Sequence, residues 1–394
     1  MEITNLKAIY IFNGMTKSQG VVSVSGGDMR LLEIMKYAPK SIKKSVLTTP
    51  NGLEFLKKYN QKYDKAYLLD QVVEGGIVSN LKISWRSFFF GRSGVKEFDG
   101  DVVYSSCEHL YDVLPALRLK RRSGARWLAV YHWVEEYPWK DNRGNTPFIP
   151  RYAYWLNRYI SGWIIKHFAD EILAVSDQTR EKLISMKKVN PNKVRAVYCG
   201  VEYDTIRNIV DKAGKKKIYD AVFMKRLNYG KGVLDLLKIW KAVVAKNPDA
   251  KLGIIGDGSE DVLSKVKEYI KTNNLEKNID ILGVIYDMDK KFQIISSSKV
   301  FLLPTYEENW AIVIGEAMAA GVPVVVSKLK EIEPIWQDNV IWCKVGDIKS
   351  FAQATLGLIN DNKKASALAL KAQKFIPRYD WKNIAENEIE IKTS

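Results

Sequence analysis

Short apolar runs alternate with longer segments of helical periodicity along the whole chain. In the first half, such runs predict strands at residues 7–12, 44–49, 65–70, 101–106, 126–132, 171–176 and 194–198. The second half repeats the pattern, with runs at residues 220–224, 251–256, 279–283, 300–304 and 322–327. Amphipathic segments between most of the runs predict helices, for example residues 233–245 and 263–272. Strands that alternate with helices on this scale predict parallel sheets covered by helices on both faces.

Each half of the chain therefore predicts an α/β domain with a doubly wound sheet. A chain of 394 residues is too long for one ordinary hydrophobic core, which agrees with two domains. The polar stretch 204–218 marks the expected boundary, so we predict an N-terminal domain at 1–205 and a C-terminal domain at 206–375. Such sheets bind ligands beyond the carboxyl ends of their strands, so we expect the two domains to face a cleft that holds the chemistry.

The composition of the chain argues against several classes of protein. The three cysteines are far apart and form no disulfide framework, and three histidines are too few for a Cys/His metal cluster. The N-terminus does not resemble a signal peptide and no apolar run is long enough to span a membrane, so we expect a cytoplasmic protein. The net charge of +16 suits nucleic acid, an anionic membrane or an anionic substrate. No nucleic-acid-binding motif is recognisable, so we do not expect nucleic acid as a partner.

Two glutamates belong to a predicted strand–loop–helix unit at residues 300–321. Glu308 lies in the loop and Glu316 follows eight positions later in the helix, so about two helical turns separate them and both can reach one ligand. The N–H groups at the helix start favour an anion such as a diphosphate. Apolar neighbours predict that Glu316 is buried, and a lone buried carboxylate needs a partner such as a ligand hydroxyl. The alternative is a solvated helix with two surface glutamates.

A basic loop follows the first predicted strand of the second half. Arg226 and Lys231 lie between the strand 220–224 and the helix 233–245, next to a helix N-terminus. Two cations and a helix N-terminus suit a pyrophosphate group. An ordinary basic loop is the alternative, which the glutamates in the same domain make less favourable.

These motifs resemble those of family 4 of the retaining glycosyltransferases, which have the GT-B fold of two Rossmann-like domains. Glu308 and Glu316 match the E-x7-E pattern of the family, and the segment 226–232 matches its R-L-x-x-x-K-G pattern. Weaker similarities extend over nearly the whole chain. The last of them implies that residues 376–394 form a helix that crosses back onto the N-terminal domain.

The resemblance implies a nucleoside-diphosphate sugar as the donor, bound mainly by the C-terminal domain. Arg226 and Lys231 would hold the diphosphate, Glu316 the ribose hydroxyls and Glu308 the sugar hydroxyls. A loop with Gly26 and Gly27 would close over the phosphates, and His132 would bind the donor sugar or lie near the reacting centre, unless it is only structural. Further donor contacts are expected from Asn309, Trp310, Ala311 and Ile312.

Several positions depart from the family pattern. Gly-Phe-Gly usually follows the first glutamate, whereas this chain has Asn309-Trp310-Ala311. Glycine there lets the backbone approach the sugar, so the sugar contacts are expected to differ. Lys225 replaces a common glycine before Arg226 and adds a positive charge near the expected phosphates.

No metal site or cofactor is expected. Two D-x-D pairs, Asp287 with Asp289 and Asp99 with Asp101, resemble the metal motif of other sugar transferases. The first pair begins a predicted helix, where acidic residues act as caps, and the second precedes a strand and indicates a turn.

The sequence therefore predicts a metal-independent, retaining glycosyltransferase of the hexosyltransferase type. No protein nucleophile is evident, so the resemblance implies attack on the face from which the phosphate departs, with catalysis by positioning and charge stabilisation. A nucleotide-sugar epimerase and a phosphorylase of similar fold are the alternatives.

Basic and aromatic residues are interleaved in three segments of the first half. Residues 117–126 contain five basic residues and no acidic one, and residues 142–169, which also lack acidic residues, place Arg151, Arg158 and Lys166 among aromatic rings. Residues 85–92 have a similar composition. This pattern favours an anionic membrane surface, so we expect a lipid-linked or membrane-held acceptor and peripheral association with the inner face of the membrane. A core helix with a solvated basic stripe is the alternative for residues 151–168.

Overall fold

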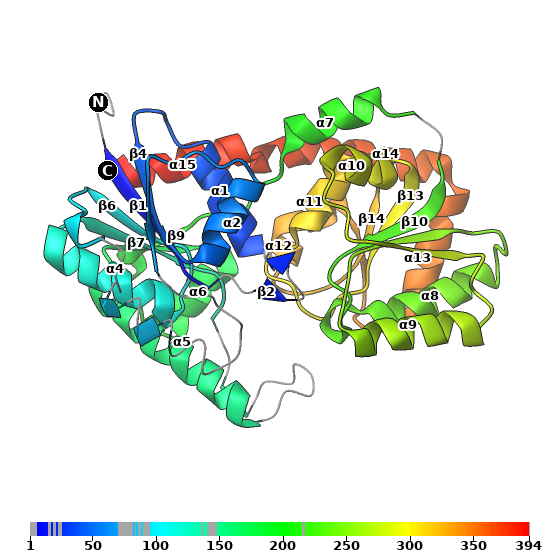
Figure 1. Cartoon of the computed structure of the whole chain (residues 1–394). Coiled ribbons are helices and arrows are strands. Elements are labelled where there is room, and N and C mark those ends of the chain that lie inside the picture. The colour runs from blue at the N-terminus through cyan, green and yellow to red at the C-terminus, as the bar shows by residue number, and fades with distance from the viewer. Residues whose placement is uncertain are drawn as a thin grey trace. The chain divides into compact units, whose positions relative to one another are not determined.

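The chain divides into two compact units in the computed structural model, Met1–Cys199 with Trp381–Ser394 and Gly200–Asp380 (Figure 1). The structure describes residues 6–14, 17–18, 21–22, 26–69, 82, 84–85, 88–89, 95–134, 137–139, 148–214 and 217–393. The expected boundary at residue 205 falls inside α7 (Tyr203–Lys212), which belongs to the second unit. This helix is amphipathic and its Ile206 is fully buried, so residues 204–212 of the polar stretch form a surface helix.

The first unit is built on a seven-stranded parallel sheet in the order β5-β4-β1-β6-β7-β8-β9. The strands are β1 (Lys7–Phe12), β4 (Lys43–Thr48), β5 (Lys65–Leu68), β6 (Val102–Ser105), β7 (Arg126–Tyr131), β8 (Glu171–Ala174) and β9 (Val194–Ala196). A short antiparallel pair, β2 (Lys17–Ser18) and β3 (Val21–Val22), follows β1. The helical elements are α1 (Gly26–Lys36), α2 (Pro50–Lys58), η1 (Val95–Glu97), α4 (Leu110–Ser123), α5 (Phe148–Phe168), α6 (Asp177–Ser185), η2 (Pro191–Lys193) and α15 (Trp381–Thr393).

Helices cover both faces of this sheet because its strands carry apolar side chains on both faces. Ile9 and Ile11 pack in a cluster with residues of α4 and α5, whereas Ala8 and Tyr10 pack in a second cluster with residues of α1 and α2. Successive residues of a strand point to opposite faces, so one apolar run supplies both cores. None of the described helices is both long and apolar enough to cross a membrane.

The C-terminal helix α15 is joined to the first unit by a buried polar triad. Arg30 of α1 forms an ion pair with Glu388 of α15, and both side chains are 1% exposed. The Tyr104 hydroxyl donates to Glu388 Oε1 at 2.8 Å, and Arg30 Nη1 donates to the Tyr104 oxygen at 2.8 Å. The triad satisfies charges that would otherwise be costly in the core, and it links the last helix to the first sheet.

The second unit contains a six-stranded parallel sheet in the order β12-β11-β10-β13-β14-β15. The strands are β10 (Tyr219–Met224), β11 (Leu252–Ile255), β12 (Ile279–Gly283), β13 (Ser298–Leu303), β14 (Val324–Ser327) and β15 (Ile341–Cys343). After α7, the helical elements are η3 (Tyr229–Lys231), α8 (Val233–Val244), α9 (Glu260–Thr272), α10 (Met288–Ser296), α11 (Ile312–Ala319), α12 (Glu333–Trp336), η4 (Gln337–Asn339), α13 (Ile348–Asn360), α14 (Asn362–Phe375) and η5 (Ile376–Tyr379). Two parallel sheets with helices confirm the predicted α/β fold class.

Candidate active site

Each sheet reverses its strand order beside its first strand. In the first sheet β1 lies between β4 and β6, and in the second β10 lies between β11 and β13. Doubly wound sheets bind ligands at the carboxyl ends of the strands at this point. In the second unit, the loops after β10 and β13 carry the predicted basic residues and Glu308, so the fold brings these two segments to one edge of the sheet.

The loops after β10 and β13 are held against each other. The Tyr306 N–H donates to the Gly230 carbonyl at 2.9 Å, and the Tyr306 hydroxyl bonds to Asp235 of α8. Gly232 has φ 72°, and a Cβ there would lie 1.8 Å from the Pro304 carbonyl oxygen. Only glycine meets both conditions, so Gly232 lets the two loops meet.

The Glu308 carboxylate is enclosed between two lysines. Lys225 Nζ lies 2.9 Å from Oε1 and 3.1 Å from Oε2, and Lys231 Nζ lies 3.3 Å from Oε1. The Glu308 side chain is 6% exposed and each lysine 19%. Burial by itself would raise the pKa of Glu308, but the two ammonium groups hold it below its usual range. The carboxylate therefore stays ionised at neutral pH, and the lysines leave the cluster with a positive balance.

Arg226 adds a third cation to this edge of the sheet. It directly follows Lys225, and its side chain is exposed. Lys231 Nζ also donates to the Glu307 carbonyl at 2.6 Å, which fixes its position at the end of η3. Two lysines on the carboxylate, with Arg226 next to Lys225 in the chain, can bind a diphosphate group. Sequence reasoning noted Lys225 only as a departure from a family pattern, whereas the structure places it closest to Glu308.

Glu316 of α11 is paired rather than isolated. Lys291 Nζ of α10 lies 3.1 Å from Glu316 Oε1, and the two side chains are 16% and 17% exposed. The partner that a buried carboxylate was expected to need is therefore supplied, at Oε1, by a lysine of α10. Lys291 lies twenty-five positions before Glu316, and no local pattern in the sequence indicates the contact.

The segment between the two glutamates differs from expectation in its side chains. Trp310 is 3% exposed, and its ring packs 4.7 Å from the Trp336 ring and 5.2 Å from the Tyr379 ring. Ala311 precedes α11 with φ 58° and ψ 60°, the left-handed conformation that glycine adopts easily. An alanine in this conformation costs on the order of 1 kcal/mol. Asn309 and Ile312 flank these two residues and are partly buried.

In the first unit, Gly26 and Gly27 are the first two residues of α1 and not part of a loop, which corrects the sequence-based expectation. A Cβ on Gly27 would lie 3.1 Å from the His132 ring, so the glycine lets the helix start against the histidine. His132 Nε2 lies 2.9 Å from the Ser106 carbonyl, which can only accept, so this nitrogen carries the proton. Burial and the nearby Arg30 charge lower the pKa of His132 to about 4, and the ring is neutral at pH 7.

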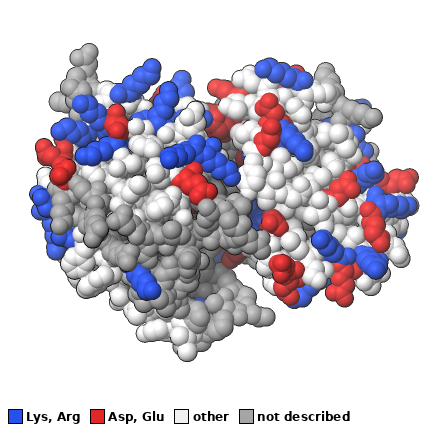
Figure 2. Space-filling model, viewed as in Figure 1, with Lys and Arg blue, Asp and Glu red and all other residues white. Residues whose placement is uncertain are grey.

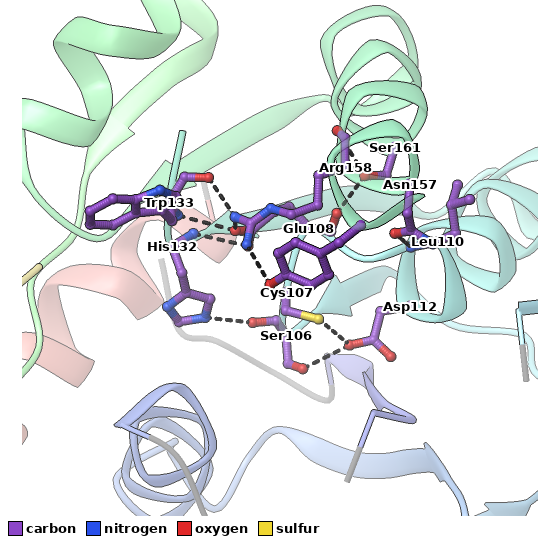
Figure 3. Close-up of polar contacts among 11 residues, drawn as sticks. Ser106, Cys107, Glu108, Leu110, Asp112, His132, Trp133, Asn157, Arg158 and Ser161 are labelled. Carbon is purple, nitrogen blue, oxygen red and sulfur yellow. Dashed lines mark hydrogen bonds and ion pairs between the residues drawn. The ribbon is translucent and has the colours of Figure 1, made fainter. Parts of the chain in front are cut away.

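A buried polar network lies behind His132 (Figure 3). The Glu108 carboxylate accepts hydrogen bonds from the backbone N–H of His132 at 3.0 Å and from the backbone N–H of Trp133 at 3.1 Å. It also forms an ion pair with Arg158 of α5. The Ser161 hydroxyl donates to the Glu108 carbonyl. Glu108 thus fixes the backbone that carries His132. The sequence analysis missed this residue, although the acidic segment directly after β6 was a possible signal.

Asp112 organises the carboxyl ends of β1 and β6. It accepts from the Asn13 N–H at 2.8 Å, the Ser106 hydroxyl at 2.9 Å and the Cys107 thiol at 3.1 Å. Burial raises the pKa of Asp112 to about 7, although these hydrogen bonds oppose the shift. Asp112 was also missed, because its bond to Asn13 joins residues 99 positions apart.

The D-x-D pairs have structural roles in the described chain. Asp287 Oδ1 accepts from the Lys290 N–H at 2.8 Å and caps α10, with Asp289 in the first turn. Asp101 Oδ2 accepts from the Lys7 N–H at 2.8 Å. No group of three or more potential metal ligands occurs among the described residues.

Two units, each built on a doubly wound parallel sheet, are the architecture of GT-B proteins. HepE of Anabaena, crystallised with UDP and glucose, superimposes with a TM-score of 0.71 over 99% of this chain and 100% of HepE, at 16% identity. Sucrose-phosphate synthase of Thermosynechococcus elongatus has a TM-score of 0.72 over 98% of each chain, at 15% identity. These similarities confirm the GT-B fold.

Sequence comparisons then identify the family. The sequence-family model described as Glycosyltransferase Family 4 matches residues 44–205. The sequence-family model described as Glycosyl transferases group 1 matches residues 203–375. The chain belongs to the glycosyltransferases of the family 4 type.

Curated relatives agree with this assignment. Phosphatidyl-myo-inositol mannosyltransferase of Mycolicibacterium smegmatis is 30% identical over 164 residues, 41% of each chain. An uncharacterised glycosyltransferase of Methanocaldococcus jannaschii is 25% identical over 234 residues, 56% of this chain and 59% of the relative. Sulfoquinovosyl transferase of Arabidopsis thaliana is 25% identical over 313 residues, 74% of this chain and 56% of the relative. These alignments therefore span between about two fifths and three fifths of the relatives' own lengths.

Proposed function

We propose that this protein transfers a sugar from a nucleoside-diphosphate sugar to an acceptor, with retention of the anomeric configuration and without a metal ion or other cofactor. The observation that carries the proposal is the Glu308 carboxylate, nearly buried between Lys225 and Lys231 at the switch point of the second sheet. A buried ion pair contributes little net stability, and buried charged groups of this kind cluster at functional sites. The crystal structure of HepE with UDP and glucose supports this type of donor.

In this proposal the cations bind the donor and stabilise its leaving group. Arg226 and Lys231 hold the diphosphate and lower the energy of the charge that develops as it departs. Lys225 adds a cation beside them and orients Glu308, which accepts hydrogen bonds from the donor sugar. Glu316 binds the ribose hydroxyls through Oε2, while Lys291 holds Oε1.

The acceptor is proposed to be a lipid-linked or membrane-held glycan. The name of the mycobacterial relative specifies mannosyl transfer to phosphatidyl-myo-inositol, a lipid. We place the protein in the cytoplasm, in peripheral contact with the inner face of an anionic membrane. His132 and the start of α1 at Gly26 and Gly27 are the proposed contribution of the first unit to catalysis and donor binding.

Substitutions at the donor site test the proposal. Arg226→Ala and Glu316→Gln should each lower kcat/KM for the donor by tens- to a thousandfold, or about 2–4 kcal/mol, because each removes a charged contact. Arg122→Ala and Glu276→Gln, at exposed positions outside the site, are the matched controls. Unchanged kcat/KM in both site variants would contradict the assignment.

A panel of nucleotide sugars distinguishes the alternative activities. The protein should release nucleoside diphosphate only when an acceptor is supplied, apart from slow donor hydrolysis. An epimerase would interconvert free donors without an acceptor, and a phosphorylase would form sugar phosphate from inorganic phosphate. Either result would replace the transferase proposal.

A further inference from the structure

The outer face of α5 carries large apolar side chains. It consists of six residues between 37% and 77% exposed, namely Ile149, Tyr152, Leu156, Tyr159, Ile160 and Trp163. At 100° per residue they form one stripe along the helix. The buried residues of α5, namely Arg158, Ser161, Ile164 and Ile165, form a stripe on the opposite side. A helix on the surface of a globular protein normally has polar residues on its outer side, whereas the outer side of α5 is apolar and its buried side includes Arg158 and Ser161.

Aromatic rings widen this outer face. Trp155 stacks on Tyr159 with ring centroids 5.2 Å apart and lies 6.0 Å from Tyr137. Tyr137 stacks on Trp139 at 4.9 Å, and these two side chains are 48% and 64% exposed. A contiguous exposed apolar surface of this kind marks an interaction site.

Cations lie at the border of the outer face. The Lys187 ammonium is 5.3 Å from the Tyr159 ring centroid, Lys166 donates to the Lys187 carbonyl at 3.0 Å, and Lys188 is exposed. The sequence of α5 contains no acidic residue. Arg158 does not contribute to this charge, contrary to the sequence-based expectation, because it is buried against Glu108.

The other predicted basic segments contribute less. In the segment 117–126, Lys120 pairs with Asp170 and Arg126 with Glu171, which neutralises much of its charge, although Arg121 and Arg122 are exposed. Residues 86–87, 90–92 and 142–147 lie outside the described residues. Among the described parts of these segments, α5 therefore combines apolar exposure with positive charge most fully.

We propose that the outer face of α5 is the surface through which this protein docks on an anionic lipid bilayer. This inference rests on the proposed function in that the acceptor is membrane-held. Tryptophan and tyrosine side chains prefer the boundary between head groups and hydrocarbon, and lysines beside them attract anionic head groups. A second copy of the chain would bring two acid-free, lysine-bordered helices together, which like-charge repulsion opposes.

Co-sedimentation with vesicles tests the docking surface on the full-length chain. The vesicles contain either phosphatidylcholine alone or equal parts of phosphatidylcholine and phosphatidylglycerol. The wild type should pellet with the anionic vesicles at low salt, less at high salt, and hardly with the neutral ones. The double variant Ile160→Ser with Trp163→Ser should bind the anionic vesicles at least about tenfold more weakly, because it removes apolar area from the interface.

A matched control separates the outer face of α5 from apolar exposure in general. Ile218→Ser with Leu370→Ser changes two side chains of the second unit that are 59% and 54% exposed, and it should bind like the wild type. Thermal unfolding checks that both double variants are folded. Equal binding by the α5 variant and the wild type, or a wild type that stays in the supernatant, overturns the proposal. A wild-type dimer that the α5 variant dissociates would assign the face to a second copy instead.

Donor cleavage without vesicles keeps the two proposals distinct. The α5 variant should hydrolyse or transfer from the donor at the wild-type rate, because the outer face of α5 holds none of the proposed donor-site residues. If the wild type binds vesicles through α5 but releases nucleoside diphosphate from no donor, either with or without an acceptor, the docking surface stands and the proposed function fails. If it cleaves donors but ignores anionic vesicles, the docking surface fails alone.

Discussion

Glu308 is buried and His132 is half-buried, and their neighbours impose different charge states. Two lysines stabilise the charged form of Glu308 more than burial disfavours it. For His132, burial and the Arg30 charge disfavour the imidazolium, and they outweigh the hydrogen bond to the Ser106 carbonyl and the Glu388 charge, which favour it. A neutral histidine beside the start of α1 can act as a hydrogen-bond partner, but not as a charge-bearing group at neutral pH.

The pKa of His132 predicts a pH-dependent stability. Between its usual value of 6.5 and the folded value of about 4, the unfolded state binds a proton that the folded state does not, so stability falls as the pH is lowered through this range. Relative to His132→Gln, the wild type should lose up to about 3 kcal/mol of unfolding free energy between pH 7 and pH 4.5. Urea denaturation at both pH values measures the difference.

Comparing the wild type with His132→Gln isolates the contribution of His132 to the pH dependence of stability. Burial raises the pKa of Asp112 to about 7, so its contribution has the opposite sign: it is present at low pH and lost as the pH rises. That contribution is common to wild type and variant and cancels. If the unfolding free energies of the wild type and of His132→Gln changed equally between pH 7 and pH 4.5, a neutral His132 would be contradicted.

At the scale of elements, α15 is attached to the first unit by side chains from three separate parts of the chain. Arg30, Tyr104 and Glu388 belong to α1, β6 and α15, and they satisfy one another in the core. A buried ion pair adds little net stability when complete, but the loss of one partner leaves an uncompensated charge. The order of α15 therefore depends on Glu388.

Glu388→Ala should destabilise the first unit by about 3–5 kcal/mol, because it leaves the Arg30 guanidinium buried without its counter-ion. Urea denaturation followed by circular dichroism measures the loss, and limited proteolysis shows whether α15 becomes accessible. Glu386→Ala, an exposed position on the same helix, is the control and should change stability little. Equal, small effects of both substitutions would show that the triad does not hold the helix.

At the scale of the whole molecule, the surplus of positive charge is unevenly distributed. Lys and Arg side chains predominate on the upper part of the first unit in Figure 2, whereas both signs are interspersed on the second. Within the second unit, Lys225, Arg226 and Lys231 gather cations at the end of β10. In the proposed function, these cations are the fixed positive charge that stabilises the departing diphosphate.

Transfer should therefore survive exhaustive treatment with EDTA, since these cations supply the charge that a divalent metal would otherwise bring. Initial rates before and after chelation should agree within about twofold, whereas a catalytic metal contributes several kcal/mol. Loss of activity that Mg²⁺ or Mn²⁺ restores would contradict the prediction. It would also direct attention back to Asp287 and Asp289.

The sequence by itself determined the fold class and the strands that carry it. Each predicted strand is present with ends within two residues of expectation, because an apolar run buried on both faces is a local signal. β15 was not predicted: its three residues form a strand through pairing with β14. The two-residue strands β2 and β3 were also missed, since so short a pairing leaves no periodicity in the sequence.

Only the tertiary structure decided which side chains meet. Glu308 was identified from its spacing to Glu316, but its two lysine partners, the Lys291 contact of Glu316 and the core position of the Trp310 ring depend on segments far apart in the chain. Arg158 shows the same limit. Its spacing suggested a solvated basic stripe. Instead, Arg158 is buried and pairs with Glu108, fifty positions away in the chain, while the apolar side of α5 faces water. Periodicity specifies which residues share a face of an element, whereas the packing of distant segments determines what that face contacts.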